Sequence, residues 1–144
     1  MTVISKSVAI NAPLAAVNAF MDQVDRIPDW FEGITKVEAE AGYPNQVGTK
    51  AEFTAKSAGL TVVSNFTLTK RDDSVREFEI EGMMSGTNKW SLREEGEITH
   101  LDLVVDYELS GGVLGKIMDR LLVERTYDSN SETSLQNLKR MIEA

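Results

Sequence analysis

The sequence contains no cysteine and only one histidine, His100. The lack of cysteine excludes a thiol nucleophile and a thiolate metal site. One histidine excludes a two-histidine metal site, and a Ser-His-Asp triad would have to be built on His100 alone. Alternation places His100 on the wet face of a strand, next to a turn, so we interpret it as a surface residue. The acids at 72–73 and 94–95 are interpreted as turn residues. No Gly-rich phosphate loop is present either, and we expect neither a metal nor a cofactor.

Basic residues are also few, since 15 Lys and Arg face 23 Asp and Glu for a net charge of −8. Binding to a phosphate backbone relies on Lys and Arg, so an acidic chain without a basic cluster is a poor candidate for binding nucleic acid or an anionic membrane. No apolar run approaches the ~20 residues that span a bilayer, so we expect no membrane insertion. The first residues lack a basic region followed by an apolar stretch, and we predict a soluble cytoplasmic protein.

The length of 144 residues fits one domain, and we predict a single domain over residues 1–144. Residues 3–10 alternate, with Ile4, Val8 and Ile10 on one face, and predict a strand. Pro13 is well placed to begin a helix, and the apolar spacing to Met21 is helical. Residues 22–30 predict a second short helix.

Between residues 34 and 109 the apolar period is two, with short turns that include 57–59, 72–74 and 82–86. This pattern is typical of an antiparallel meander with one wet and one dry face. The dry face is predicted to carry Ala51, Phe53, Ala55, Leu60, Val62, Ser64, Phe66, Leu68, Arg76, Phe78, Ile80, Asn88, Trp90, Leu92, Leu101, Leu103, Val105, Tyr107 and Leu109. Residues 114–143 lack proline, and lack glycine after Gly115. They predict a helix on the order of 40 Å long that covers the dry face, which gives an α+β fold.

The predicted inward stripe of this last helix is apolar only at its ends. Spacings of three and four give Ile117, Leu121, Glu124, Asp128, Ser131, Leu135, Leu138 and Ile142, with Arg125 beside the polar middle. A buried unpaired carboxylate is very costly, so a tightly packed helix should be apolar at its centre. Two interpretations stay open. Either the helix centre stands over a cavity, or the stripe drifts and leaves these residues at a solvated edge.

Two segments resemble a known family. Ile10-Asn11-Ala12-Pro13, Val17 and residues 25–30 (Asp-Arg-Ile-Pro-Asp-Trp) resemble the opening of the START-like, or Bet v 1-like (SRPBCC), superfamily in its polyketide cyclase/dehydrase branch. Residues 114–119 and 134–139 are similar to the end of the same branch. The resemblance covers the whole chain. The chain departs from the pattern at Asn18, where many relatives carry a large aromatic residue.

The resemblance implies a helix-grip fold, with a curved seven-stranded antiparallel sheet around the long C-terminal helix and two short helices after the first strand. A cavity is implied between the sheet and that helix. Members bind lipids, sterols, plant hormones or polyketides, and a minority catalyse cyclisation or dehydration. The branch has no single catalytic motif, so no catalytic residue is carried over.

The candidate ligand-binding residues follow from the predicted dry face and helix stripe. They are Trp30, Phe53, Phe66, Phe78, Trp90, Tyr107, Leu121, Arg125 and Asp128. Trp30 has an alternative role as a plug between helix and sheet, and the alternative for the other aromatic residues is plain core. The hydroxyl of Tyr107 needs a partner if it is buried. Glu124, Arg125 and Asp128 are candidates for orienting a ligand or for acid–base chemistry, or else form an ion pair.

The sequence predicts that the chain binds a small hydrophobic molecule in a cavity of roughly 300–1,000 Å³. One alternative is an enzyme of the cyclase, aromatase or dehydratase type, in which several polar groups converge in the pocket. Another is a protein-interaction domain, with a filled core and an exposed apolar patch.

Overall fold

A computed structural model of the chain describes residues 2–114 and 120–144. In this part of the chain, seven strands form one antiparallel sheet: β1 (Thr2–Ile10), β2 (Ile34–Ala39), β3 (Lys50–Ser57), β4 (Leu60–Arg71), β5 (Val75–Gly82), β6 (Met84–Glu95) and β7 (Ile98–Leu109). The spatial order β1-β7-β6-β5-β4-β3-β2 means that β2 to β7 are joined as consecutive hairpins. β1 closes the far edge by pairing with β7.

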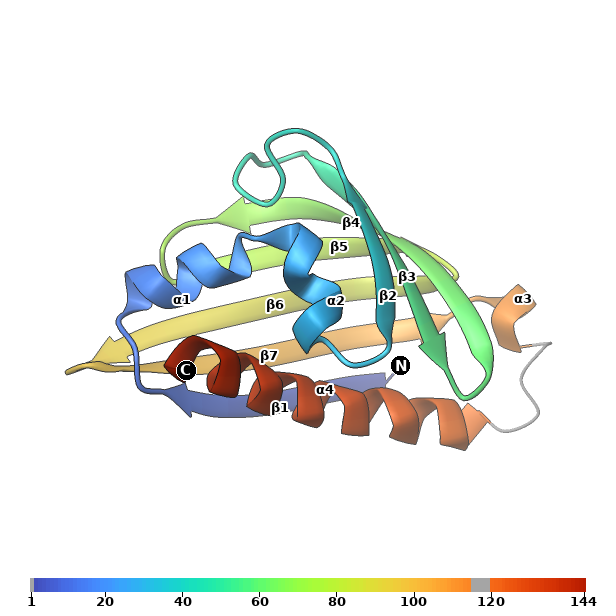
Figure 1. The fold of residues 1–144 in the computed structure, drawn as a ribbon. Helices are drawn as coiled ribbons and strands as arrows, with labels where there is room; N and C mark the ends of the chain where they lie inside the picture. Colours follow the sequence, from blue (N-terminus) through green and yellow to red (C-terminus); the bar gives the residue numbers. More distant parts are fainter. Residues whose placement is uncertain (1, 115–119) are drawn as a thin grey trace.

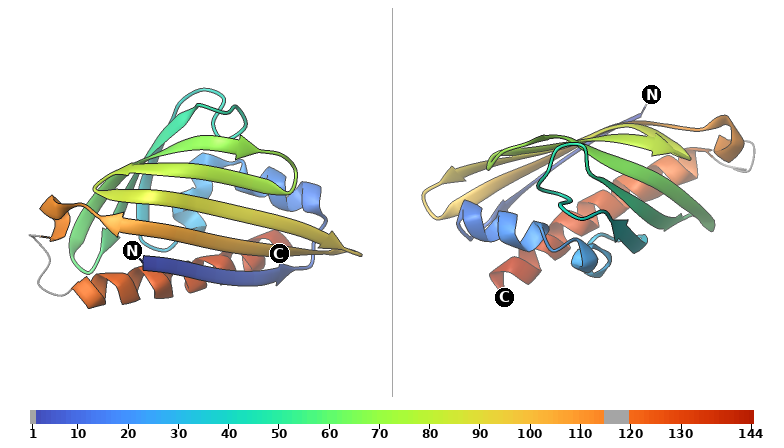
Figure 2. Two further views of the ribbon diagram at one scale, coloured as in Figure 1. Left: turned by 180° about the vertical axis from the view of Figure 1, so that it is seen from behind. Right: turned by 90° about the horizontal axis from the view of Figure 1, so that it is seen from above.

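Four of the described helices lie on the inner face of this curved sheet, and no described helix covers its outer face (Figures 1 and 2). They are α1 (Leu14–Met21), the one-turn 3-10 helix η1 (Val24–Arg26), α2 (Ile27–Trp30) and α4 (Arg120–Glu143), whereas α3 (Gly111–Leu114) follows the end of β7. The predicted α+β helix-grip fold is therefore confirmed. Predicted positions 115–119, including Ile117, lie outside the described residues. None of the helices in the described ranges is long and apolar enough to cross a membrane.

The inner face of the sheet is the predicted dry face. Its most deeply buried apolar residues are Ile4, Ile10, Leu68, Ile80, Leu101, Leu103, Val105 and Tyr107. The aromatic residues of β3 to β6 are also buried, as are the polar residues Ser64, Arg76 and Asn88. Period-two alternation assigned these positions because each strand buries one face only.

The predicted turn at residues 82–86 is shorter in the structure, because the chain turns at Met83 between β5 and β6, and Met84, Ser85 and Gly86 already belong to β6. Gly86 has a φ of 144°, and a Cβ at this position would lie 1.9 Å from the carbonyl oxygen of Asp106. Only glycine permits this close approach of β6 to β7. The glycines that suggested a turn therefore accommodate a bend within the sheet.

The inward stripe of α4 agrees with the predicted one at Ser131, Leu135 and Leu138 and differs from it in the first half of the helix. The buried helix residues are Val123, Ser131, Ser134, Leu135 and Leu138. Glu124 and Asp128 lie at the edge of the helix that faces β1. There Lys6 Nζ donates to Asp128 Oδ2 at 2.9 Å, and Thr2 Oγ1 donates to Glu124 Oε1 at 2.9 Å. The solvated-edge interpretation is the correct one, since the Asp128 side chain is 51% exposed.

The opposite edge of α4 is fastened to the segment around α2. Ser134 Oγ accepts a hydrogen bond of 2.8 Å from the backbone N–H of Glu32, and Asn137 Nδ2 donates to the carbonyl of Trp30 at 3.1 Å. Contacts on both edges fix the rotation of the helix. As a result Val123 and Tyr127, rather than Glu124 and Asp128, face the middle of the sheet.

Candidate ligand-binding cavity

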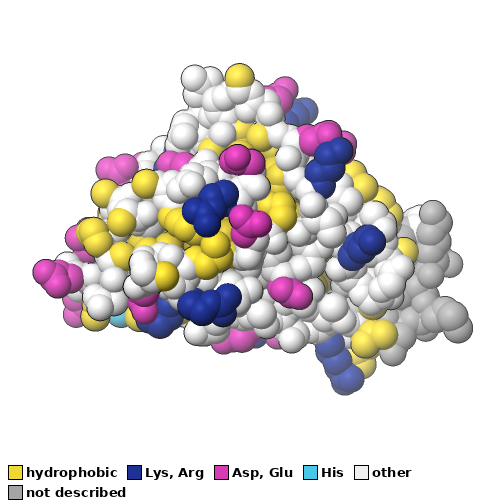
Figure 3. Space-filling view, viewed as in Figure 1, with side chains coloured by type: hydrophobic (Ala, Val, Ile, Leu, Met, Phe, Trp, Pro, Cys, Tyr) yellow, Lys and Arg dark blue, Asp and Glu magenta, His cyan; other side chains and the backbone are white. Residues whose placement is uncertain are grey.

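A cavity of about 130 Å³ lies between the inner face of the sheet, the α1–α2 segment and α4. Its volume is smaller than the predicted 300–1,000 Å³, because aromatic rings from several elements occupy much of the space. Its wall contains Trp30, Phe31, Tyr43, Phe53, Phe66, Phe78, Trp90, Tyr107 and Tyr127. Hydrophobic side chains also gather on the surface over α1, α2 and the β2–β3 connection (Figure 3), near the part of the wall formed by Val24 and Pro44.

The aromatic rings of the wall contact one another. The centroids of Phe53 and Phe66 are 4.5 Å apart, and Phe66 continues to Phe78 at 6.3 Å. Trp30 of α2 meets Trp90 edge-on at 6.1 Å. Tilted and edge-to-face pairs at these separations are the favoured arrangements of aromatic rings. They make a wall of large, stiff side chains around the cavity.

Six of the candidate residues named from the sequence line this cavity: Trp30, Phe53, Phe66, Phe78, Trp90 and Tyr107. The structure does not bring Leu121, Arg125 or Asp128 to it. These three surround a separate surface depression beside β1, and Leu121 is 52% exposed. Their placement in the cavity was wrong because the predicted stripe began one helical position away from the true one.

The residues that α4 does contribute to the wall are Val123, Tyr127 and Asn130. Sequence reasoning missed them, although the spacing of four from Val123 to Tyr127, Ser131 and Leu135 was an available signal. The ring of Tyr127 meets the ring of Tyr107 at 5.0 Å, edge-on. This contact closes the cavity between the helix and β7.

Several polar atoms of the wall are buried and have no hydrogen-bond partner in the described structure. They are Trp30 Nε1, Ser57 Oγ, Arg76 Nε, Asn88 Oδ1 and Tyr107 Oη. Buried polar groups in proteins are normally hydrogen-bonded, because an unsatisfied one carries its full desolvation cost. These atoms are therefore the candidate polar contacts of a bound molecule.

The sheet register separates the polar atoms of the wall. Arg76 is paired with Trp90, and Phe78 is paired with Asn88, while Gly86 is paired with Tyr107. Neighbouring rows on one face are two residues, or roughly 6.6 Å, apart along a strand. Arg76, Asn88 and Tyr107 thus follow one another along the cavity and do not converge on one point.

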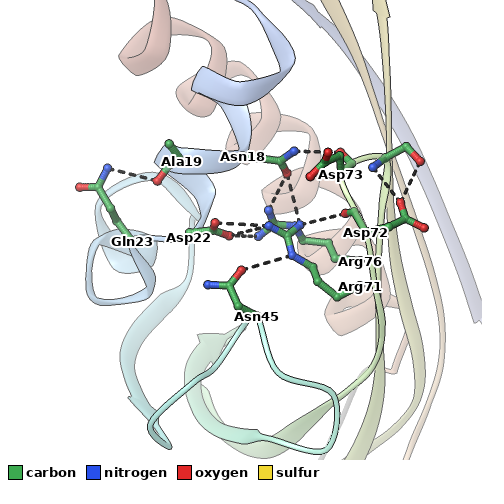
Figure 4. A network of polar contacts seen from close by, with 10 residues as sticks. Asn18, Ala19, Asp22, Gln23, Asn45, Arg71, Asp72, Asp73 and Arg76 are labelled. Carbon is green, nitrogen blue, oxygen red and sulfur yellow. Dashed lines mark hydrogen bonds and ion pairs between the residues drawn. The ribbon is translucent and has the colours of Figure 1, made fainter.

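A buried polar cluster stands at the Arg76 end of the cavity, made of Asn18 and Asp22 from the α1 segment with Arg71 and Arg76 from the sheet (Figure 4). Arg76 Nη1 lies 3.0 Å from Asp22 Oδ1, and Arg76 Nη2 donates to Asn18 Oδ1 at 2.7 Å. Arg71 Nη2 lies 3.2 Å from the same Asp22 oxygen. Asn18, the departure from the family pattern, is thus the residue that joins α1 to both guanidinium groups.

Burial shifts the pKa values of Arg76 and of the three tyrosines of the wall without changing their charge at neutral pH. Burial, reinforced by the charge of Arg71, lowers the pKa of Arg76 to about 10, and Asp22 acts in the opposite direction. Arg76 therefore remains positively charged at neutral pH. Burial raises the pKa of Tyr107 to about 12, and burial also raises the pKa values of Tyr43 and Tyr127. The tyrosine hydroxyls are neutral donors.

His100 lies outside the cavity, where its Nε2 is 3.4 Å from Glu95 Oε2 near the β6–β7 turn. Within residues 2–114 and 120–144, no group of three His, Cys, Asp or Glu side chains is arranged to hold a metal ion.

The sequence matches the family model described as polyketide cyclase / dehydrase and lipid transport over residues 1–143. The chain belongs to this family. The seven-stranded sheet that curves around α4 is the helix-grip arrangement of the START and Bet v 1 superfamily, in which the polyketide cyclase branch lies. No curated protein sequence matches the chain.

Solved structures similar to this family member come from several bacteria. A Thermus thermophilus protein is 21% identical with a TM-score of 0.78, over 98% of this chain and 97% of that one. The Zhui aromatase/cyclase of Streptomyces is 21% identical with a TM-score of 0.75, over 99% and 93%. A START superfamily protein of Mycobacterium smegmatis is 14% identical with a TM-score of 0.70, over 98% and 94%. At these identities the similarity shows the fold alone.

Proposed function

We propose that this chain binds a small hydrophobic molecule in the cavity between the sheet and α4. The observation that carries the proposal is an internal space walled by contacting aromatic rings, with buried polar atoms that lack partners. Ligand sites in proteins have this composition, a mostly apolar wall with a few placed polar groups. An interaction domain with a filled core would leave no such space.

The spacing of the polar groups favours binding over catalysis. A general acid or base must come within hydrogen-bond reach of the proton that it transfers, and such sites gather several groups at one point. Here Arg76, Asn88 and Tyr107 lie on successive rows of the sheet. The other ionisable residues of the described wall, besides the tyrosines, are Glu32 and Lys56, whose side chains are exposed.

The cavity volume sets the size of the ligand. A void of about 150 Å³ in another protein holds a benzene molecule, so about 130 Å³ accommodates a group of about one aromatic ring. A larger body enters if the long side chains of the wall, such as Tyr127, change rotamer.

The test is a calorimetric titration with benzyl alcohol, an uncharged molecule with one aromatic ring, the size that the cavity accommodates. We expect saturable binding. Val123→Phe places extra volume in the cavity, because Val123 lines it, and should weaken binding at least about tenfold. Leu122→Phe, at the neighbouring helix position that is 50% exposed, is the matched control and should bind as the wild type does.

Absence of binding by the wild type, or equal binding by the Val123→Phe and Leu122→Phe proteins, would contradict the proposal. The cyclase alternative would be favoured instead if the wild type turned over polyketide-like substrates and an Arg76 or Tyr107 variant lost this turnover while its substrate affinity stayed unchanged.

A further inference from the structure

We infer that the cavity selects molecules that carry a single carboxylate, and that Arg76 binds this group. The inference rests on the proposed function, because it assigns a chemical class to the ligand of the same cavity. The carboxylate would lie at the end of the cavity next to α1, with the hydrophobic body of the ligand against Phe66 and Phe78.

The first support is an unused donor. Arg76 is only 2% exposed and belongs to the cavity wall. Its terminal nitrogens contact Asp22 and Asn18, but Nε has no acceptor among the described residues. A guanidinium N–H donates its strongest hydrogen bonds to carboxylates. The Nε–H group of Arg76 is therefore a buried, unpaired donor on a residue of the cavity wall.

The second support is the charge balance of the cluster. Arg71 and Arg76 share one carboxylate, that of Asp22, so the group has an excess of one positive charge. Buried charges are normally paired, since an uncompensated one is costly. The charged residues whose fields act on Arg76 are Arg71 and Asp22. A monoanionic carboxylate supplies the one missing charge, whereas a dianionic phosphate would exceed it and would need more donors.

The third support is the arrangement of the remaining wall. Moving away from Arg76, the sheet presents Phe78 with Asn88 in the next row and Tyr107 in the row after it. Among the described charged residues of the wall, Arg76 is the buried one, whereas Glu32 and Lys56 are exposed. A ligand with one anionic end and an apolar or aromatic body matches this polarity, and the direction in which it lies is fixed by the charge.

The experiment compares benzoate with uncharged benzyl alcohol, which has the same ring, by calorimetry at neutral pH. The wild type should bind benzoate at least about tenfold more tightly, the usual range for a hydrogen bond to a charged group. Arg76→Met should remove this preference. Arg71→Met removes the same charge from the same cluster but leaves the Arg76 Nε–H donor in the wall, because Arg71 does not line the cavity, so it should reduce the preference without abolishing it. Near-UV circular dichroism checks that both variants are folded.

Equal affinity of the wild type for the two ligands would overturn the carboxylate inference and leave the proposed binding of hydrophobic molecules intact. Loss of the preference in both arginine variants alike would assign it to the field of the cluster and not to Arg76 Nε, which also contradicts the inference. If neither ligand binds, the proposed function itself fails.

Discussion

Two groups of charged side chains flank the interior of this protein, and they differ in burial. Glu124, Arg125 and Asp128 on α4 lie at an exposed edge beside β1. Asp22, Arg71 and Arg76 lie between α1 and the sheet, where the Arg76 side chain is almost inaccessible. In the linear sequence the first group attracts attention because it interrupts an apolar stripe. The second group is inconspicuous, because its members come from three separate elements.

The difference shows which polar residues of this fold must remain buried. When polar residues interrupt the apolar stripe of a helix, rotating the helix by one position exposes them to water and avoids the cost of burying them. A polar residue at an inward position of a central strand has no such freedom, because its register is fixed by both neighbouring strands. Arg76 pairs within the sheet from both sides and must be neutralised where it stands.

The largest effect should come from Asp22→Ala. This change leaves two guanidinium groups side by side, one of them buried, with no carboxylate between them. Removing one partner of a buried ion pair costs roughly 3–5 kcal/mol. Because the Asp22 side chain is 27% exposed, we expect about 3 kcal/mol of lost stability in urea unfolding.

The matched control is Asp128→Ala, which removes a carboxylate from the exposed group and should cost less than about 1 kcal/mol. Similar losses in the two variants would mean that the buried and exposed clusters are energetically equivalent, which would contradict the comparison.

The tyrosines provide a second measure of the dry interior. All three tyrosines of the chain line the cavity, and burial raises their pKa values, that of Tyr107 to about 12. The folded protein therefore keeps these protons above pH 10, where an unfolded tyrosine loses its own. The tyrosines then contribute stability that is fully present below about pH 10 and is lost as the pH rises toward 12.

Absorbance of tyrosinate during an alkaline titration should accordingly rise only above about pH 11, and in parallel with unfolding. A tyrosine that ionises near pH 10 in the folded state would show that water enters the cavity freely.

A smaller effect is expected when one arginine of the buried cluster is replaced. Arg76→Met and Arg71→Met each leave one guanidinium for Asp22, so no buried charge loses its partner. Exchanging buried ionic groups for apolar ones is often neutral or stabilising. Both variants should stay within about 1 kcal/mol of the wild type in urea unfolding. A loss as large as that of Asp22→Ala would mean that the cluster needs both positive charges.

The sheet and its inner face were predictable because period-two alternation is a local signal that each strand carries by itself. The bend at Gly86 was not predictable, since the reason for the glycine is the carbonyl of Asp106 on the neighbouring strand. The rotation of α4 was missed for a similar reason. It depends on contacts with Lys6 and Glu32, which lie far away in the sequence.

The candidate site was predictable only in its strand-borne aromatic residues and Trp30. Arg76 and Asn88 were correctly placed on the dry face, but alternation does not tell which inward polar residue is compensated by neighbours. The pairing of Arg76 with Asp22 and Asn18 joins β5 to α1, and such contacts become visible only in the folded chain.

The smallest effect should come from Asp128→Leu, which tests the exposed side of the comparison. Asp128 accepts one hydrogen bond from Lys6, and Lys6 Nζ also lies 3.8 Å from Glu132 Oε2, so the lysine keeps a neighbouring carboxylate after the change. Exposed ion pairs of this kind contribute roughly 0.2–1 kcal/mol, and we expect a stability change within that range. Because Asp128 does not line the cavity, affinity for benzyl alcohol should equal that of the wild type. A decrease of more than about threefold in affinity, with stability unchanged, would show that the polar centre of α4 acts on the ligand after all, either by contact or through its charge, which acts on the wall residue Tyr107.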